Sequence, residues 1–476
     1  MRLGDLLEGR FSTSFDEIEI SGVTDNSAKV EKGTLFVCVK GGSFDGHTFA
    51  AEAIEKGAAA VVCERDLGLE RQIIVGNSRK EYGNLCAKWF NHPERRLKLI
   101  GVTGTNGKTT MTKLIKDILT ASGHRVGLIG TIQNEIGDRV VPTGNTTPPA
   151  YEFMQLLKEM SLSGCDSVVM EVSSFALSQY RIGPSKFRVA VFTNLTQDHL
   201  DYHGDMENYY LAKKKLFSLC DKAIVNIDDE YGRRLLDEIN CEKYSYSIKN
   251  TADFYADNIS VSDNSISYDF CFGGERVPVT AGMTGNFNVS NTLAAVAACR
   301  NIAIPMEKIT TALADYNGVR GRCEVIPTGR DFTVICDYAH TPDALENVLS
   351  SLRETKKGRL ICLFGCGGNR DRTKRPLMAA AAAKYCDRLI VTSDNPRDEI
   401  PSEIIKDILA GLEGTKVPYD TIEDRREAIA FALKNAEKND IIVLAGKGHE
   451  DYQEIAGRVH LHFDEREVVA EELAKI

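Results

Sequence analysis

The residues that point most directly to chemistry form the segment Leu99-Ile-Gly-Val-Thr-Gly-Thr-Asn-Gly-Lys-Thr-Thr110, in which an apolar run leads into glycines and then into Gly-Lys-Thr-Thr. Such glycines let backbone N–H groups close around phosphate oxygens, while a helix N-terminus and a lysine add positive charge. Val102 stands where the strict GxxxxGK[ST] pattern has its first glycine, and a ligand-free turn is the alternative. The spacing nevertheless predicts a nucleotide phosphate site with Thr109 on Mg²⁺. The chain lacks an Asn-Lys-x-Asp guanine-reading tetrad, which favours ATP.

Other polar residues are candidates for metal binding or catalysis. Glu171 ends the apolar run 167–170, at the edge where α/β sheets place ligands, although it could equally cap a helix. His199 has acidic neighbours, but a lone histidine is more often structural. Lys213 is one of three consecutive lysines, which by themselves indicate a solvated helix face.

Two further segments carry polar residues at positions where they could contact a ligand. Asn288 and Asn291 are three residues apart and share a face of an expected helix, where their amides can bracket an adenine edge, although polar residues near a helix start are the alternative. Asp394-Asn-Pro-Arg397 follows the apolar run 389–391, at a strand's carboxyl end. An Asn-Pro turn is the default interpretation of such a tetrapeptide.

The elements that must position these residues alternate between β-branched apolar runs and helix-period segments, so the predicted fold class is α/β with mostly parallel sheets. The alternation between Asp253 and Thr280 is polar/apolar, which indicates an antiparallel insert. The length of 476 residues favours about three domains. Pro and Gly punctuation predicts the boundaries 1–92, 93–326 and 327–476.

The composition and charge argue against a membrane-spanning, nucleic-acid-binding or exported protein. Hydrophobic residues make up 43% and charged residues 26%, and no apolar stretch approaches the roughly 18 residues that span a bilayer. The net charge of −10 argues against a nucleic-acid partner. Acids near Met1 argue against a signal peptide, and the thirteen scattered cysteines are expected to be reduced. We therefore expect a cytoplasmic protein with no membrane insertion.

Thr103-Gly-Thr-Asn-Gly-Lys-Thr-Thr110 resembles the phosphate loop of the Mur ligases, ATP-dependent amide-forming enzymes of peptidoglycan precursor synthesis. Further segments match in family order across the chain: Glu171-Val-Ser-Ser174, 193–204, 285–291, 321–324, 337–343, Asp394-Asn-Pro-Arg397 and 446–453. The resemblance implies a small α/β N-terminal domain for a uridine nucleotide, a central P-loop ATPase domain and a Rossmann-like C-terminal domain for an amino acid.

The resemblance also implies roles for individual residues. The ATP-binding set is Gly104, Thr105, Asn106, Gly107, Lys108, Thr109, Thr110, Asn288, Asn291, Arg322, Asp337 and His340. The implied catalytic residues are Lys108, Lys213, Glu171 and His199, and the implied Mg²⁺ ligands are Thr109, Glu171, His199 and Lys213. Lys213 would be carbamylated by CO₂, because a bare ammonium cannot coordinate a metal.

Two further sets concern the substrates. The UDP-substrate set is Ser27, Gly42, Ser43, Phe44, Asn145, Thr146, Thr147, Ser173, Gln179 and Arg181. Asn-Ser-Ala at positions 26–28 replaces the family's usual Asp-Ser-Arg. The amino-acid set is Arg370, Asp394, Asn395, Pro396, Arg397, Gly446 and Glu450. In this set Arg397 offers a bidentate partner for the far carboxylate of meso-diaminopimelate.

The expected activity is ligation of meso-diaminopimelate to a UDP-muramoyl dipeptide by a monomer that uses ATP, Mg²⁺ and a carbamylated Lys213. A lysine-adding ligase of the same family differs mainly at the amino-acid pocket. A folylpolyglutamate synthase would not be expected to carry Asp394-Asn-Pro-Arg397 with this first domain. A non-enzymatic ATP switch would leave the charged motifs of the third domain unexplained.

Overall fold

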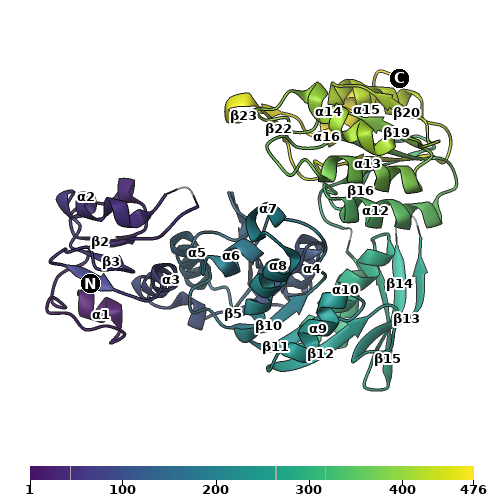
Figure 1. Cartoon of the computed structure of the whole chain (residues 1–476). Helices are drawn as coiled ribbons and strands as arrows, with labels where there is room; N and C mark the ends of the chain where they lie inside the picture. Colours follow the sequence, from purple (N-terminus) through teal and green to yellow (C-terminus); the bar gives the residue numbers. More distant parts are fainter. Residues whose placement is uncertain (43, 263–264, 317) are drawn as a thin grey trace.

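The computed structural model describes residues 1–476 apart from 43, 263–264 and 317, and arranges them around three separate sheets (Figure 1). The first sheet has four parallel strands in the order β1-β2-β3-β4. Its strands are β1 (Gly22–Thr24), β2 (Thr34–Val37), β3 (Ala60–Cys63) and β4 (Gln72–Ile74), and its helices are α1 (Leu3–Leu7), α2 (Ala50–Glu55) and α3 (Ser78–Trp89).

The central sheet has eleven strands in the order β15-β14-β13-β12-β11-β10-β5-β9-β6-β7-β8. The strands are β5 (Lys98–Thr103), β6 (Val126–Ile129), β7 (Asn134–Ile136), β8 (Arg139–Val141), β9 (Ser167–Glu171), β10 (Phe187–Phe192), β11 (Cys220–Asn226), β12 (Glu242–Ser247), β13 (Phe254–Val261), β14 (Ile266–Phe272) and β15 (Glu275–Ala281). Strands β12 to β6 pair in parallel, whereas β13, β14 and β15 pair antiparallel, so the predicted antiparallel insert is confirmed.

Eight helices accompany this sheet in the described part of the chain, and α4 is the one that matters most for the site. Its buried face, including Met111, Leu114 and Ile118, packs in one core with Ile100 and Val102 of β5 and with the apolar residues of α10. The helices are α4 (Lys108–Ala121), α5 (Ala150–Leu162), α6 (Ser174–Ser178), α7 (Leu200–His203), α8 (Met206–Lys214), α9 (Glu230–Glu238), α10 (Asn286–Asn301) and α11 (Met306–Ala314). The phosphate loop is therefore held between two rigid elements.

The third sheet has six strands in the order β16-β17-β21-β18-β19-β20, parallel except for β16 at one edge. The strands are β16 (Glu324–Ile326), β17 (Thr333–Asp337), β18 (Leu360–Phe364), β19 (Arg388–Val391), β20 (Tyr419–Thr421) and β21 (Ile441–Ala445), with a separate hairpin of β22 (Tyr452–Ile455) and β23 (Val459–His462). The helices are α12 (Pro342–Thr355), α13 (Lys374–Tyr385), α14 (Pro401–Leu409), α15 (Arg425–Lys434) and α16 (Glu465–Leu473). The predicted α/β class is confirmed.

Neighbouring units touch through helices. Helix α3 packs on α5, and α10 lies against α12 (Figure 1). Gly83 of α3 lies so near Gly183 that a Cβ there would sit 2.8 Å from the Cα of Gly183. The exact domain limits remain a prediction, and β16 already belongs to the third sheet although it begins at Glu324. Among the described helices none combines the length and the apolar character needed to cross a bilayer.

Candidate active site

A cavity of about 1730 Å³ lies between the carboxyl ends of the central strands and the third sheet's loops. It brings together most of the predicted residues: Thr105, Asn106, Gly107, Lys108, Thr109, Thr110, Asn145, Thr146, Thr147, Glu171, Ser173, Arg181, His199, Lys213, Asn291, Arg322, Asp337, His340, Arg370, Asp394, Asn395, Arg397, Gly446 and Glu450. The described candidates outside its lining are Gly104, Asn288, Gln179, Pro396, Ser27, Gly42 and Phe44. Ser43 lies outside the described residues.

The phosphate loop turns between β5 and α4 on two glycines with positive φ, Gly104 at 150° and Gly107 at 85°. A side chain at Gly104 would collide with the hydroxyl of Thr193, because an added Cβ would lie 1.8 Å from its Oγ1. A Cβ at Gly107 would lie 2.6 Å from Oδ1 of Asn291. Glycine is therefore required for packing at both positions, independently of any phosphate.

Two lysines converge on this loop. Nζ of Lys108 donates to the carbonyl oxygens of Gly104 (2.9 Å) and Thr105 (2.7 Å), and Nζ of Lys213 donates to the same Gly104 oxygen at 2.7 Å. Lys213 is only 2% exposed, and its burial together with the charge of Lys108 lowers its pKa well below the usual value. Burial also lowers the pKa of Lys108. The neutral amine of Lys213 is thus favoured.

Glu171, the last residue of β9, lies beside the first turn of α4. Its Oε1 accepts a hydrogen bond from the hydroxyl of Thr109 at 3.0 Å, and Thr131 donates to the carboxylate through its backbone N (2.8 Å) and its hydroxyl (3.0 Å). In the described part of the chain no three His, Cys, Asp or Glu side chains cluster as a metal site. The hydroxyl and carboxylate oxygens nevertheless suit Mg²⁺, which takes one or two carboxylates and completes its shell with water and phosphate.

His199 precedes α7 in a left-handed conformation with φ 54°. Its Nε2 lies 3.4 Å from Oδ2 of Asp198, and its ring meets the rings of Phe175 and Tyr209 edge-on. Burial raises the pKa of Asp198, but His199, His340 and Lys374 outweigh that effect and lower it. The site therefore carries an ionised carboxylate next to His199 that sequence reasoning did not assign to it.

Contacts from the third unit reach across the cavity to the phosphate loop. Nη2 of Arg322 donates to the hydroxyl of Thr109 at 3.1 Å, and its guanidinium lies 4.6 Å from the ring centroid of Tyr338. Oδ2 of Asp343 accepts hydrogen bonds from Nδ2 of Asn106 (2.7 Å) and the hydroxyl of Thr196 (3.1 Å). Side chains of the central and third units are therefore hydrogen-bonded to each other at the site.

Asp337 and His340 shape the same side of the cavity through the backbone. Asp337 accepts the backbone N–H groups of Cys323 and Ala339, each at 2.7 Å, and burial raises its pKa. Nδ1 of His340 lies 2.9 Å from the carbonyl oxygen of Tyr338. Burial and the charge of Lys374 lower the pKa of His340 to about 4. His340 is therefore neutral near pH 7.

The two asparagines of α10 make different contacts. Nδ2 of Asn288 donates to the carbonyl oxygen of Thr284 at 2.8 Å, and its Oδ1 accepts from Nδ2 of Asn291 at 3.1 Å. Asn291 lines the cavity beside Gly107. Asn288 thus supports Asn291, and only Asn291 can contact a ligand directly here.

The residues expected near the muramoyl dipeptide are hydrogen-bonded to the backbone of Glu171 and to one another. Thr147 donates from its hydroxyl to the backbone oxygen of Glu171 (2.8 Å) and accepts the N–H of Ser173 (3.1 Å). Nη1 of Arg181 donates to the carbonyl of Thr147 at 3.0 Å, and Gln179 holds the Nε of Arg181 at 3.0 Å. Gln179 thus orients Arg181, although Gln179 does not itself line the cavity.

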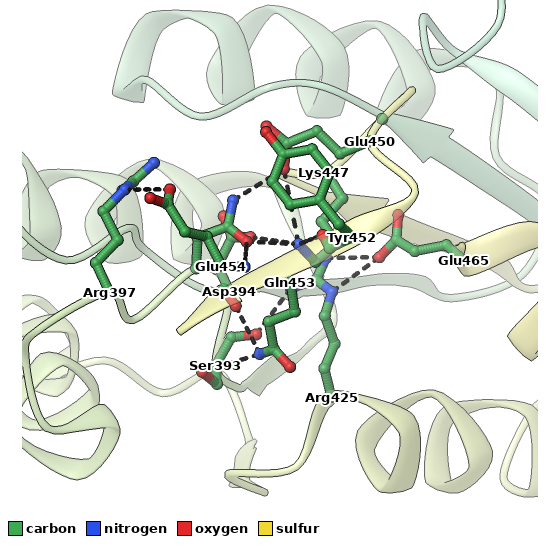
Figure 2. A network of polar contacts seen from close by, with 12 residues as sticks. Ser393, Asp394, Arg397, Arg425, Lys447, Glu450, Tyr452, Gln453, Glu454 and Glu465 are labelled. Atoms are coloured by element: carbon green, nitrogen blue, oxygen red, sulfur yellow. Dashed lines mark hydrogen bonds and ion pairs between the residues drawn. The ribbon is translucent and has the colours of Figure 1, made fainter. Parts of the chain in front are cut away.

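The side of the cavity expected to bind the amino acid is organised around a buried cation that sequence reasoning did not assign, Lys447 (Figure 2). Its Nζ lies 3.3 Å from Oδ1 of Asp394 and donates to Oδ1 of Asn395 (2.9 Å) and to the carbonyl of Tyr452 (2.7 Å). Nδ2 of Asn395 in turn donates to Oε2 of Glu450 at 2.9 Å. Lys447 belongs to the matched segment 446–453, so that match was the signal available in the sequence.

The two acids beside Lys447 have pKa values that are shifted in opposite directions. Burial raises the pKa of Asp394, but Lys447 and Arg425 outweigh burial and lower it. Burial and the nearby Asp394 instead raise the pKa of Glu450. Gly446 has φ 115°, and a Cβ there would lie 3.0 Å from Oδ2 of Asp394. The pocket thus offers one strongly ionised acid and one weaker acid.

Arg397 already has a protein partner, which the sequence did not reveal. Its Nε donates to Oε2 of Glu454 at 2.7 Å, and its Nη1 donates to the carbonyl oxygen of Gly368 at 2.9 Å. Arg370 is exposed at the rim of the same cavity. Arg397 is thus already paired within the protein, and its expected contact with a far carboxylate stays a prediction.

The described N-terminal candidates lie between the strands of the first sheet, in the purple part of Figure 1, and none of them lines the cavity. Asn26 uses its Oδ1 to accept the N–H of Ala28 at 2.9 Å, which shapes the turn that contains Ser27. Phe44 is 59% exposed. Any ligand shared by these residues and the cavity must be long.

Comparison with known proteins shows which families, relatives and solved structures the chain is similar to. Residues 19–98 match the Mur ligase family catalytic domain, residues 102–299 the Mur ligase middle domain and residues 321–448 the Mur ligase glutamate ligase domain. A UDP-N-acetylmuramoyl-L-alanyl-D-glutamate–2,6-diaminopimelate ligase of Clostridium acetobutylicum is 46% identical, covering 95% of each chain. The enzyme of that name from Clostridioides difficile is 43% identical over 100% of each. A solved structure of a ligase of that name has TM-score 0.73 and 32% identity, covering 100% of this chain and 99% of its own.

Proposed function

The chain belongs to the Mur ligase family, and we propose that it is the ATP-dependent, ADP-forming ligase that adds meso-diaminopimelate to UDP-N-acetylmuramoyl-L-alanyl-D-glutamate. The observation that carries the proposal is a single cavity lined both by the phosphate loop and by the Asp394–Arg397 segment. A ligase needs such a cavity because the activated carboxyl group and the incoming amine must meet out of water. The full-length relatives named for this reaction support the same substrates.

The reaction consists of two transfers. The free side-chain carboxylate of the dipeptide's glutamate attacks the γ-phosphorus of ATP, which forms an acyl phosphate and releases ADP. The amine of meso-diaminopimelate then attacks the acyl carbon, and phosphate leaves as the amide forms. The first step brings two anions together, and Lys108, Arg322 and the N-terminus of α4, which line the cavity, would reduce that repulsion.

Thr109 and Glu171 are the residues that would hold a first Mg²⁺, with His199 near a second. Bound Mg²⁺ would supply charge neutralisation at the phosphates. For Lys213, the lowered pKa supports carbamylation, because CO₂ reacts with the neutral amine. Carbamylation would turn a buried amine into an anion that can bind metal next to the phosphate loop.

The domain roles follow from the same proposal. The region 1–92 would bind the uridine nucleotide through Ser27, Gly42, Ser43 and Phe44, the region 93–326 would bind ATP, and the region 327–476 would bind the amino acid. In this proposal the UDP-muramoyl dipeptide would extend from the first region to Thr147 and Arg181, which line the cavity. ADP-bound relatives of this fold are consistent with ATP as the nucleotide. We propose that the protein works as a cytoplasmic monomer on small molecules.

The test is phosphate release from ATP with the UDP-muramoyl dipeptide and either meso-diaminopimelate or lysine. Lysine lacks the far carboxylate and would set its ammonium near Arg397, so we expect kcat/KM for meso-diaminopimelate to be higher by about 10⁴. Arg397→Ala should raise the KM for meso-diaminopimelate far more than the KM for ATP. Comparable kcat/KM for the two amino acids in the unmodified enzyme would contradict the assignment and favour the lysine-adding ligase.

A further inference from the structure

We propose that Glu454 is a specificity-determining positioning residue, which fixes the guanidinium of Arg397 so that it selects an amino acid with a far carboxylate. This inference rests on the proposed function. Glu454 lies on β22, outside the Asp394-Asn-Pro-Arg397 motif and 57 residues from Arg397. Its Oε2 accepts the Nε–H of Arg397 at 2.7 Å, and its backbone oxygen accepts the N–H of Arg397 at 3.1 Å (Figure 2).

The guanidinium of Arg397 is held from two directions. Glu454 holds Nε, while the carbonyl oxygen of Gly368 accepts from Nη1 at 2.9 Å. Gly368 packs closely against the residue before Arg397, because a Cβ at Gly368 would lie 1.9 Å from the carbonyl oxygen of Pro396. Two anchors on one planar group fix its plane. The remaining N–H groups belong to the Nη1 and Nη2 end of the fork, the end that pairs with a carboxylate through two parallel hydrogen bonds.

The backbone of Arg397 also needs this support. Arg397 has φ 51°, in the left-handed region that non-glycine residues seldom adopt. Its N–H bond to Glu454 and a parallel bridge to Ile455 hold that conformation. Without the strand, the strained turn would be free to relax and carry the side chain with it.

Strand β22 is in turn fixed to the motif by buried contacts, so Glu454 is no mobile surface acid. Lys447 bridges Asn395 and the carbonyl of Tyr452, and the N–H of Glu454 donates to Oδ1 of Asn395 at 2.9 Å. Nε2 of Gln453 donates to the carbonyl of Asp394 at 2.6 Å. The side chains of Arg397 and Glu454 are 19% and 17% exposed, which separates them from solvated ion pairs.

The experiment compares Glu454→Ala, Glu454→Gln and the unmodified enzyme by kcat/KM for meso-diaminopimelate and lysine and by KM for ATP. We expect Glu454→Ala to raise the KM for meso-diaminopimelate by about 10- to 100-fold, the range typical when a group that orients a ligand-binding side chain is lost. The KM for ATP should stay unchanged and discrimination against lysine should fall. Glu454→Gln keeps an oxygen that accepts from Nε, so it should restore most of the loss.

A double-mutant cycle separates positioning from a general effect on the hairpin. In an Arg397→Ala background, Glu454→Ala should add almost nothing, because its effect acts through Arg397. His462→Ala is the matched control: it changes an exposed residue of β23, and we expect normal kinetics. Equal losses for meso-diaminopimelate, lysine and ATP, or unchanged discrimination in Glu454→Ala, would overturn the inference. Failure of the unmodified enzyme to release phosphate with meso-diaminopimelate would instead contradict the proposed function.

Discussion

Two parts of the cavity are built in different ways. The first is the proposed phosphate region around residues 104–110, and the second is the proposed amino-acid region around residues 394–397 and 446–454. At the phosphate loop, consecutive residues between β5 and α4 provide most groups, and Lys108 donates to carbonyls only four and three residues away. In the amino-acid region, the side chain of Asn395 meets Lys447 and the backbone N–H of Glu454, which lie 52 and 59 residues further along the chain. The phosphate loop itself is thus a local motif to which distant residues such as Lys213 and Arg322 are added, whereas the amino-acid region is assembled mainly by tertiary contacts.

The difference concerns charge as well as distance along the chain. Lys108 and Arg322 both lie beside the start of α4, so this region concentrates positive charge where phosphate would bind. The amino-acid region instead balances Lys447 against two acids and Arg397 against Glu454. A concentrated cationic site suits a polyanion, while a balanced site suits a zwitterion whose groups must be recognised one by one.

The largest effect is expected when the phosphate region is broken at Lys213. Lys213→Ala removes the buried amine that would become a metal-binding anion, so turnover should fall by about 100- to 1,000-fold while ATP still binds. The measurements are phosphate release and equilibrium binding of ATP. Lys214→Ala is the matched control, because Lys214 pairs with Glu238 at the surface. Near-normal turnover of Lys213→Ala would contradict its proposed role.

The next largest effect is expected when a buried ion pair that supports the amino-acid region is broken. Arg425 and Glu465 are both fully buried, and Arg425 also donates to the carbonyl oxygens of Ser393 and Ala445. Arg425→Met leaves a buried carboxylate without its partner, which should lower the free energy of unfolding of the third unit by about 3–5 kcal/mol. Hydrogen exchange of the amides of β21 measures this change.

The control lies one position along the helix. Arg426 pairs with Glu471 at the surface, so Arg426→Ala should cost less than about 1 kcal/mol. If the exchange of β21 responds equally to both substitutions, the amino-acid region does not depend on its buried charges.

A smaller effect is expected at Glu171, where the account predicts a metal role. Glu171→Ala should raise the Mg²⁺ concentration needed for half-maximal turnover by about tenfold or more, whereas Lys108→Ala should lower turnover at every Mg²⁺ concentration. Thr131→Val keeps the carboxylate and removes one hydrogen bond to it, so it should shift the titration less. Identical titrations of the Glu171 and Lys108 variants would count against the metal role.

The smallest expected effect is on the pH dependence of stability. Burial and Lys374 hold the pKa of His340 at about 4, so the folded protein keeps this ring neutral while the unfolded chain takes up a proton below about pH 6.5. The contribution of His340 to stability is therefore complete above pH 6.5 and declines as the pH falls toward 4, by at most about 1.4 kcal/mol per pH unit.

His340→Gln should flatten that decline in hydrogen-exchange measurements between pH 6.5 and 4. His462 provides a control of opposite sign, because its bond to Glu467 raises its pKa. Its contribution is present at low pH and is lost as the pH rises through the folded pKa. An unchanged pH slope in His340→Gln would show that the ring is not held neutral.

The same contrast explains what the sequence could predict. The α/β class, the antiparallel insert and the position of the phosphate loop follow from periodicity and from a local motif. The pairing of Arg397 with Glu454 and of Asn106 with Asp343 could not be predicted, because the partners are 57 and 237 residues apart. The supporting role of Asn288 depends equally on a contact within the fold, its bond to the carbonyl of Thr284.

The central claim is that both regions act on one reaction, in which the dipeptide carboxylate takes the γ-phosphoryl group before the amine attacks. The most direct test labels both oxygens of the dipeptide's side-chain carboxylate with ¹⁸O and follows the label during turnover with ATP and meso-diaminopimelate. One ¹⁸O atom should appear in each released phosphate, because the carboxylate oxygen that attacked phosphorus leaves with it. Release of unlabelled phosphate together with amide formation would contradict the account.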